Sequence, residues 1–150
     1  MKSTKSLKVI IFIFLPVLIA VFAGCAGTAH LSPDEIIITN AIYGFFQAIS
    51  DQDWDSARSY CVYESIAYND VYDIEELWYS NPEEADEIDI EFIVEDIDAI
   101  IITGEYAEAF VSVNARILYN GVIGEDSLGE TLSVYLQKIG DSWKLYNIEE

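Results

Sequence analysis

The sequence predicts an α+β domain in which N-terminal helices pack on one face of a curved antiparallel β-sheet. Two observations carry this prediction. Between residues 32 and 80 apolar residues recur at helical spacing, whereas from residue 88 onward they alternate with polar residues as in half-buried strands. No internal repeat interrupts this order. About 120 residues after the N-terminal segment suffice for one core, so the chain is expected to form one domain over residues 32–150.

The first helix is predicted from Ser32 to Ser50. Ser32 is a good N-cap, Pro33 suits the first helical position, and Glu35 completes a capping box with Ser32. One helical face carries apolar residues spaced four, three and four apart, which are Ile38, Ile42, Phe45 and Ile49. We expect this face to be buried.

The second helix is predicted to be short and to start after a break at residues 51–53. Asp51 or Asp53 is expected to cap it, because acids favour the first turn of a helix. Its apolar stripe is formed by Trp54, Ala57, Tyr60 and Cys61. Cys61 on this stripe is predicted to act as a small buried hydrophobic residue.

The third helix is predicted over residues 71–79, ahead of Pro82. Asn69 or Asp70 is the expected cap. The residues expected to face inward are Ile74, Leu77 and Trp78.

Four strands are predicted from alternating patterns after residue 88. They cover residues 88–95, 107–119, 132–137 and 143–148. Gly104 and the pair Gly140-Asp141 mark turns between them. Residues 120–129 contain three glycines and are predicted to be a connection without strand structure.

Residues 1–24 resemble a secretory signal. They hold three lysines and no acid, followed by an apolar run over residues 9–23. A retained transmembrane helix is the alternative. That run has 15 residues and is interrupted by Pro16, which falls short of the ~20 residues that span a bilayer.

The end of this segment, Phe22-Ala23-Gly24-Cys25, resembles the lipobox of bacterial and archaeal lipoproteins. The resemblance implies that Cys25 is lipidated and anchors the domain to the outer side of the cytoplasmic membrane, with residues 25–31 as a tether. The alternative is a disulfide between Cys25 and Cys61, which an oxidising compartment would permit.

The charge of the chain excludes some functions. From Cys25 onward there are 27 acidic and four basic residues, a net charge of −23. A nucleic-acid partner is therefore not expected, because such a partner is bound by clustered lysines and arginines. The single histidine, His30, lies in the tether, so histidine-dependent nucleophilic catalysis is not expected. The sequence predicts no metal and no cofactor.

Two acidic motifs have simpler explanations than a ligand. Asp51-x-Asp53-x-Asp55 is similar to the opening of a calcium loop, but Ser56 and Val62 stand where the glycine and the closing glutamate are needed. The acidic strip, residues 83–98, could steer cations or a basic partner. A solvated strand face and loop explains it more simply.

A long helix is followed by Asp51-Gln52-Asp53-Trp54, a short helix and meandering strands. The strands end in the segment Leu136-Gln137-Lys138-Ile139-Gly140-Asp141-Ser142-Trp143-Lys144-Leu145. This pattern resembles the nuclear transport factor 2-like superfamily. The chain is especially similar to the small exported lipoprotein members. The resemblance implies a sheet wrapped around the first helix, a pocket between helices and strands, and frequent homodimers through the outer sheet face.

The same resemblance raises the question of catalysis. Tyr43 lies where steroid-isomerase members carry their oxyanion-hole tyrosine, and Asp70 is the one carboxylate near the expected place of the base. The second, protonated acid expected near Ser133 or Val134 is missing, and one neutral donor stabilises a dienolate weakly. Such an enzyme is therefore the alternative to a non-catalytic domain.

The leading expectation is a membrane-anchored domain that binds a small amphipathic ligand or a protein partner. Aromatic residues with a few hydroxyls suit the wall of such a pocket, and the candidates are Tyr43, Phe46, Tyr68 and Trp78. A surface protein that acts through its acidic residues is a further alternative.

Overall fold

The computed structural model describes residues 31–80, 88–120, 122–126 and 129–150. The predicted signal, Cys25, His30 and the acids from Glu83 to Glu87 lie outside the described residues. Ser32–Glu150 forms one compact unit, apart from Met1–Leu31. Among the helices that the structure describes, none is long and apolar enough to cross a membrane.

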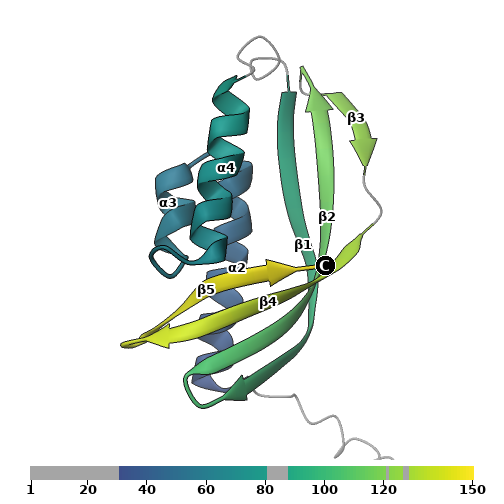
Figure 1. Cartoon of the computed structure of the whole chain (residues 1–150). Coiled ribbons are helices and arrows are strands. Elements are labelled where there is room, and N and C mark those ends of the chain that lie inside the picture. The colour runs from purple at the N-terminus through teal and green to yellow at the C-terminus, as the bar shows by residue number, and fades with distance from the viewer. Residues whose placement is uncertain (1–30, 81–87, 121, 127–128) are drawn as a thin grey trace, which may run out of the picture. The chain divides into compact units, whose positions relative to one another are not determined.

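The predicted α+β class is confirmed. Three helices come first, followed by strands of one antiparallel sheet, and the helices lie together on one side of that sheet (Figure 1). The helices are α2 (Pro33–Ser50), α3 (Trp54–Ser59) and α4 (Ile66–Ser80), and the strands are β1 (Ile88–Thr103), β2 (Tyr106–Tyr119), β3 (Val122–Asp126), β4 (Glu130–Ile139) and β5 (Ser142–Glu149). The sheet order is β1-β2-β4-β5, and β3 pairs with the far end of β2.

Helix α2 begins as its sequence predicts. The Ser32 hydroxyl accepts from the Glu35 N–H at 3.2 Å, and the Glu35 carboxylate accepts from the Ser32 N–H at 2.6 Å. The predicted face, from Ile38 to Ile49, is buried against the sheet and the other helices. Asp34 ties this end of α2 to the β4–β5 hairpin by accepting from Lys138 Nζ at 2.9 Å and Trp143 Nε1 at 3.0 Å.

Helix α3 is also close to its prediction. Asp53 is the N-cap and accepts from the Ser56 N–H at 3.1 Å. Trp54 and Ala57 are buried, and Cys61 is only 3% exposed. Burial raises the pKa of the Cys61 thiol to about 12, so this cysteine acts as a packing residue rather than a nucleophile.

The prediction for α4 was wrong in its start and in part of its buried face. The helix begins at Ile66, and the Ser65 hydroxyl, not Asn69 or Asp70, accepts from the first turn, with 3.2 Å to the Tyr68 N–H. Its buried residues are the small Ala67 and Val71. Of the residues predicted to face inward, Trp78 packs half-buried against the core, whereas Ile74 is 39% and Leu77 66% exposed.

The strands differ from prediction in two places. β1 runs to Thr103, eight residues beyond the predicted end, and register shifts leave Glu95 and Asp98 without an opposite residue in the backbone register with β2. Such bulges bend a strand and interrupt the alternation of apolar and polar residues. The alternation therefore did not predict residues 96–103 as part of the strand. The connection predicted over residues 120–129 contains β3, because the edge of β2 offers backbone partners there.

Both edges of the main sheet are bonded to other parts of the chain. On β1, the Phe92 N–H donates to the Ser50 hydroxyl oxygen at 2.8 Å. On β5, the Leu145 N–H donates to the Tyr60 carbonyl at 2.9 Å, and its carbonyl accepts from the Val62 N–H at 2.7 Å. Helix α2 is thus tied to the edge strand β1 at its C-terminal end.

The Ser50–Phe92 bond is expected to contribute measurably to stability. Ser50→Ala leaves the Phe92 N–H without its partner, and the expected loss is about 1–2 kcal/mol of unfolding free energy. Urea denaturation followed by circular dichroism measures it. Ser59→Ala is the matched control, because its hydroxyl makes only an exposed bond within α3, and its effect should stay below about 0.5 kcal/mol. Equal losses in both variants would contradict this assignment.

Candidate functional site

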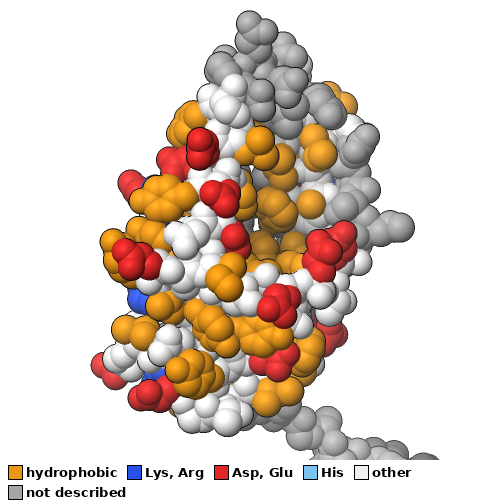
Figure 2. Space-filling model, viewed as in Figure 1, with side chains coloured by type: hydrophobic (Ala, Val, Ile, Leu, Met, Phe, Trp, Pro, Cys, Tyr) orange, Lys and Arg blue, Asp and Glu red, His pale blue; other side chains and the backbone are white. Residues whose placement is uncertain are grey.

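An open cavity lies between α4 and the sheet, and we call it the inner cavity. Its volume is about 270 Å³. Figure 2 shows a hollow between α4 and the sheet, with hydrophobic side chains inside and acidic side chains around it. The residues that line the inner cavity are Phe45, Phe46, Ile49, Ala67, Asp70, Val71, Ile74, Phe92, Leu132, Ile148, Glu149 and Glu150.

The inner cavity exists because α4 presents small residues to it. Ala67 and Val71 are fully buried on the face of α4 that turns to the core. The larger Trp78 packs half-buried against the core and does not line the inner cavity. The concave sheet, bent by the bulges in β1, therefore leaves space that the helix does not fill.

A second cavity, which we call the edge cavity, lies between α2 and the edge strand β1. Its volume is about 550 Å³, and it is more polar, with Tyr43, Gln47, Asp51, Asp89 and Glu91 among its lining residues. Phe46 and Phe92 line both cavities. Their ring centroids are 6.2 Å apart, so this aromatic pair forms part of the wall of each.

The structure separates the residues that the sequence proposed for the pocket. Phe46 lines both cavities, and Tyr43 lines the edge cavity and is 44% exposed. Tyr68 lines neither of them. It packs between Tyr63 and Tyr72, with ring centroids 5.3 and 5.5 Å away. Tyr68 lies in the first turn of α4, a segment that the sequence pattern predicts to precede the helix.

Tyr43 and Asp70, the weak catalytic candidates, do not form one site. Tyr43 borders the edge cavity, whereas Asp70 borders the inner cavity on α4. Within the described part of the chain, no carboxylate is hydrogen-bonded to the Tyr43 hydroxyl. The acid and the hydroxyl that an isomerase-like site would combine thus face different spaces.

The position of Asp70 at the inner cavity changes the pKa of its carboxyl group. Asp70 is exposed at the border of the cavity, but partial burial beside the apolar wall, followed by the nearby charge of Asp73, raises the pKa of Asp70 above its usual value. Within the described residues its carboxylate has no hydrogen-bond or ion-pair partner. A nearby cation would favour the charged form of this carboxylate.

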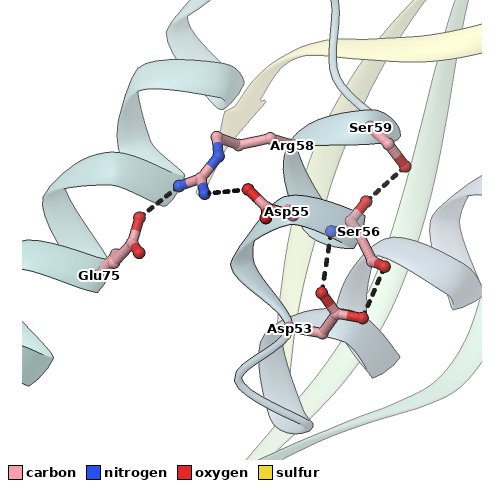
Figure 3. A network of polar contacts seen from close by, with 6 residues as sticks. All are labelled: Asp53, Asp55, Ser56, Arg58, Ser59 and Glu75. Atoms are coloured by element: carbon pink, nitrogen blue, oxygen red, sulfur yellow. Dashed lines mark hydrogen bonds and ion pairs between the residues drawn. The ribbon is translucent and has the colours of Figure 1, made fainter.

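Arg58 is held away from both cavities in a network that joins α3 to α4 (Figure 3). It donates to Asp55 at 2.7 Å and to Glu75, and its guanidinium lies 4.3 Å from the centre of the Tyr72 ring. Burial opposes the charge, but the bonds to Asp55 and Glu75 outweigh it and raise the pKa of Arg58. Asp53 and Asp55 therefore have structural partners rather than the arrangement of a calcium loop.

The described part of the acidic strip is a solvated strand face. Asp89, Glu91, Glu95, Asp96 and Asp98 are all exposed. Several have partners on the neighbouring strand: Glu95 accepts from Asn114, Asp98 accepts from Ser112 at 3.2 Å, and Glu91 lies 4.0 Å from Arg116.

The architecture matches solved structures, although no protein-family model and no curated protein matches the sequence. A conserved protein from Planctomyces limnophilus superposes with a TM-score of 0.62 at 14% identity, covering 78% of this chain and 94% of that one. A protein of unknown function with a cystatin-like fold from Nostoc punctiforme gives 0.56 at 9% identity, covering 79% and 91%.

A third match carries the fold name. It is a candidate dehydratase from the NTF2-like family of Streptomyces avermitilis, with a TM-score of 0.55 at 15% identity over 77% of this chain and 94% of that one. The chain has the nuclear transport factor 2-like fold. At these identities the likeness concerns the fold alone, so the function of this nuclear transport factor 2-like domain depends on its own residues.

Most of the inner cavity wall was not identified from the sequence. Phe45 and Ile49 were predicted as core residues, and Phe92 was predicted on a buried strand face. The spacing of apolar residues along the sequence distinguishes buried from exposed positions. It does not show whether other side chains fill the space next to a buried face. Only Asp70 and Phe46 were selected as candidates and also line the inner cavity.

Asp70 is expected to make stability depend on pH. Because its pKa is raised in the folded state, the domain loses stability as pH rises from the usual value of 3.8 through the raised value. Asp70→Asn should therefore be more stable than the wild type at pH 7, and the difference should vanish below about pH 3.8. Urea midpoints across this range measure it. Glu76→Gln, which removes a charge from the exposed face of α4, is the control, and an equal gain there would contradict the prediction.

Proposed function

We propose that this chain is a non-catalytic, lipid-anchored domain that binds a small amphipathic ligand in the inner cavity, outside the cytoplasmic membrane. The observation that carries the proposal is the open, largely apolar space between α4 and the sheet. Ligand sites are concave and mostly apolar, with a few polar groups that orient the guest. The inner cavity has this composition, since acids at its border accompany aromatic and aliphatic walls.

The volume favours a small guest. About 270 Å³ is near the lower end of the usual range for ligand pockets, which begins at about 300 Å³. The wall includes Phe45, Phe46 and Phe92, whose rings offer large flat surfaces to an alkyl or aromatic group. A guest of modest size with one apolar end fits these conditions.

The separation of Tyr43 from Asp70 supports a binding role rather than catalysis. General acid–base chemistry needs the proton donor and acceptor within reach of the same substrate atom. Here the two candidates border different cavities. The likeness to a candidate dehydratase does not supply the missing residues, because it is a likeness of fold.

The proposed location depends on the N-terminal sequence. The basic start, the apolar run and the lipobox-like Phe22-Ala23-Gly24-Cys25 support export followed by lipidation at Cys25. The net charge of −23 from Cys25 onward would keep the domain from lying flat on anionic lipid.

Filling the inner cavity should weaken binding of a neutral apolar probe. Ile74 lines the cavity and is 39% exposed, so the larger side chain of Ile74→Trp can extend into it. The expected effect is a loss of affinity for N-phenyl-1-naphthylamine of about tenfold, equal to ~1.4 kcal/mol, measured by fluorescence titration of the folded domain.

Leu77→Trp is the matched control for that experiment. Leu77 lies on the same helix, is 66% exposed and does not line the inner cavity, so probe affinity should be retained. A wild-type protein that does not bind the probe, or an equal loss in both variants, would contradict a ligand site here.

The anchor is tested separately from the cavity. Growth with a labelled lipid precursor should label the wild-type protein, and Cys25→Ser should remove the label, because the thiol is the proposed acceptor of the lipid. Cys61→Ser is the control, since Cys61 is buried in the domain, and it should keep the label. Labelling that survives Cys25→Ser would refute the anchor.

A further inference from the structure

We infer that the guest of the inner cavity is a cationic amphiphile, with an apolar body held between α4 and the sheet and an amine or similar positive group at the acidic mouth. This inference rests on the proposed ligand site and specifies the chemical class of its ligand. It follows from the distribution of apolar, acidic and basic side chains around the cavity.

The apolar part of the guest has a defined place. Phe45, Phe46 and Ile49 of α2 line one side of the inner cavity, while Phe92 and Leu132 line it from the sheet. Removing an alkyl chain from water onto such a wall is favourable at roughly 25 cal/mol per Å² of apolar surface. A small ion without an apolar body would leave this wall exposed.

The charged side chains that line the cavity are all acidic. They are Asp70, Glu149 and Glu150. The Glu149 carboxylate already accepts from the Asn147 amide at 2.6 Å. Asp70 has no such partner within the described residues, and Asp73 lies close enough to disfavour its charge further. A positive group beside Asp70 would offset both the cost of partly burying its charge and the repulsion from Asp73.

An anionic guest would find no counter-charge. The four basic residues after Cys25 are all described, and none lines the inner cavity. Arg58 is paired with Asp55 and Glu75, Lys138 with Asp34, and Lys144 donates to the Ser59 carbonyl at 2.6 Å. Arg116 on β2 lies 4.0 Å from Glu91, which borders the edge cavity. In Figure 2 the basic side chains that can be seen lie away from the hollow.

Three guests with alkyl chains of similar length test this inference. Octylammonium, octanol and octanoate carry a positive, a neutral and a negative head group, and each can be tested for displacement of N-phenyl-1-naphthylamine from the domain at pH 7. The expected order of affinity is octylammonium, octanol, octanoate. Octylammonium should bind about fivefold more tightly than octanol, the upper range for one solvent-exposed ion pair.

Two variants distinguish a local contact from the overall negative field. Asp70→Asn should reduce the preference for octylammonium over octanol to less than about twofold. Glu76→Gln removes an equal charge from α4 outside the cavity and should keep the preference. Rising salt should weaken octylammonium binding and spare octanol.

The outcomes separate this inference from the proposed function. If octanol and the neutral probe do not bind, the proposed ligand site itself fails. If octanol binds and octylammonium binds no more tightly, the ligand site stands and the cationic class is wrong. An equal loss of preference in Asp70→Asn and Glu76→Gln would also overturn the inference, because it would assign the effect to net charge rather than to the mouth of the cavity.

Discussion

The packing of α2 on the concave face of the sheet is the constraint on which the other elements depend. One face of this helix is buried along its length, and both ends are tied to the sheet by polar groups. Asp34 holds the N-terminal end to Lys138 and Trp143 on the β4–β5 hairpin, and Ser50 bonds the edge strand β1 at Phe92. Because distant parts of the chain meet α2 at these points, the helix fixes the curvature that the strands must follow.

The inner cavity is a consequence of this arrangement and of the small buried face of α4. With α2 seated against the sheet and β1 bent by two bulges, the space under α4 could be closed only by large side chains. Ala67 and Val71 occupy the inward positions instead, and Leu77 points to solvent. The space between α4 and the sheet is therefore incompletely packed, as expected for the proposed binding site.

The positions of the four basic residues support the proposed cationic guest. In a domain with a net charge of −23, each of the four cations has a structural partner, and Arg58 in particular joins α3 to α4. No positive side chain borders the inner cavity. The proposed preference for a cationic guest therefore depends on Asp70 at the border of the cavity rather than on the overall negative charge of the surface.

The sequence by itself determined the order of helices and strands, the capped start and buried face of α2, an aspartate cap for α3 and the positions of β2, β4 and β5. These features depend on residues a few positions apart, so periodicity and capping residues predict them. The start of α4, the bulges at Glu95 and Asp98, and β3 were decided by the tertiary structure, because each depends on a partner far along the chain. The inner cavity belongs with them. Whether Phe45, Ile49 and Phe92 fill a core or line an open space depends on the volume left between packed elements, which no local pattern encodes.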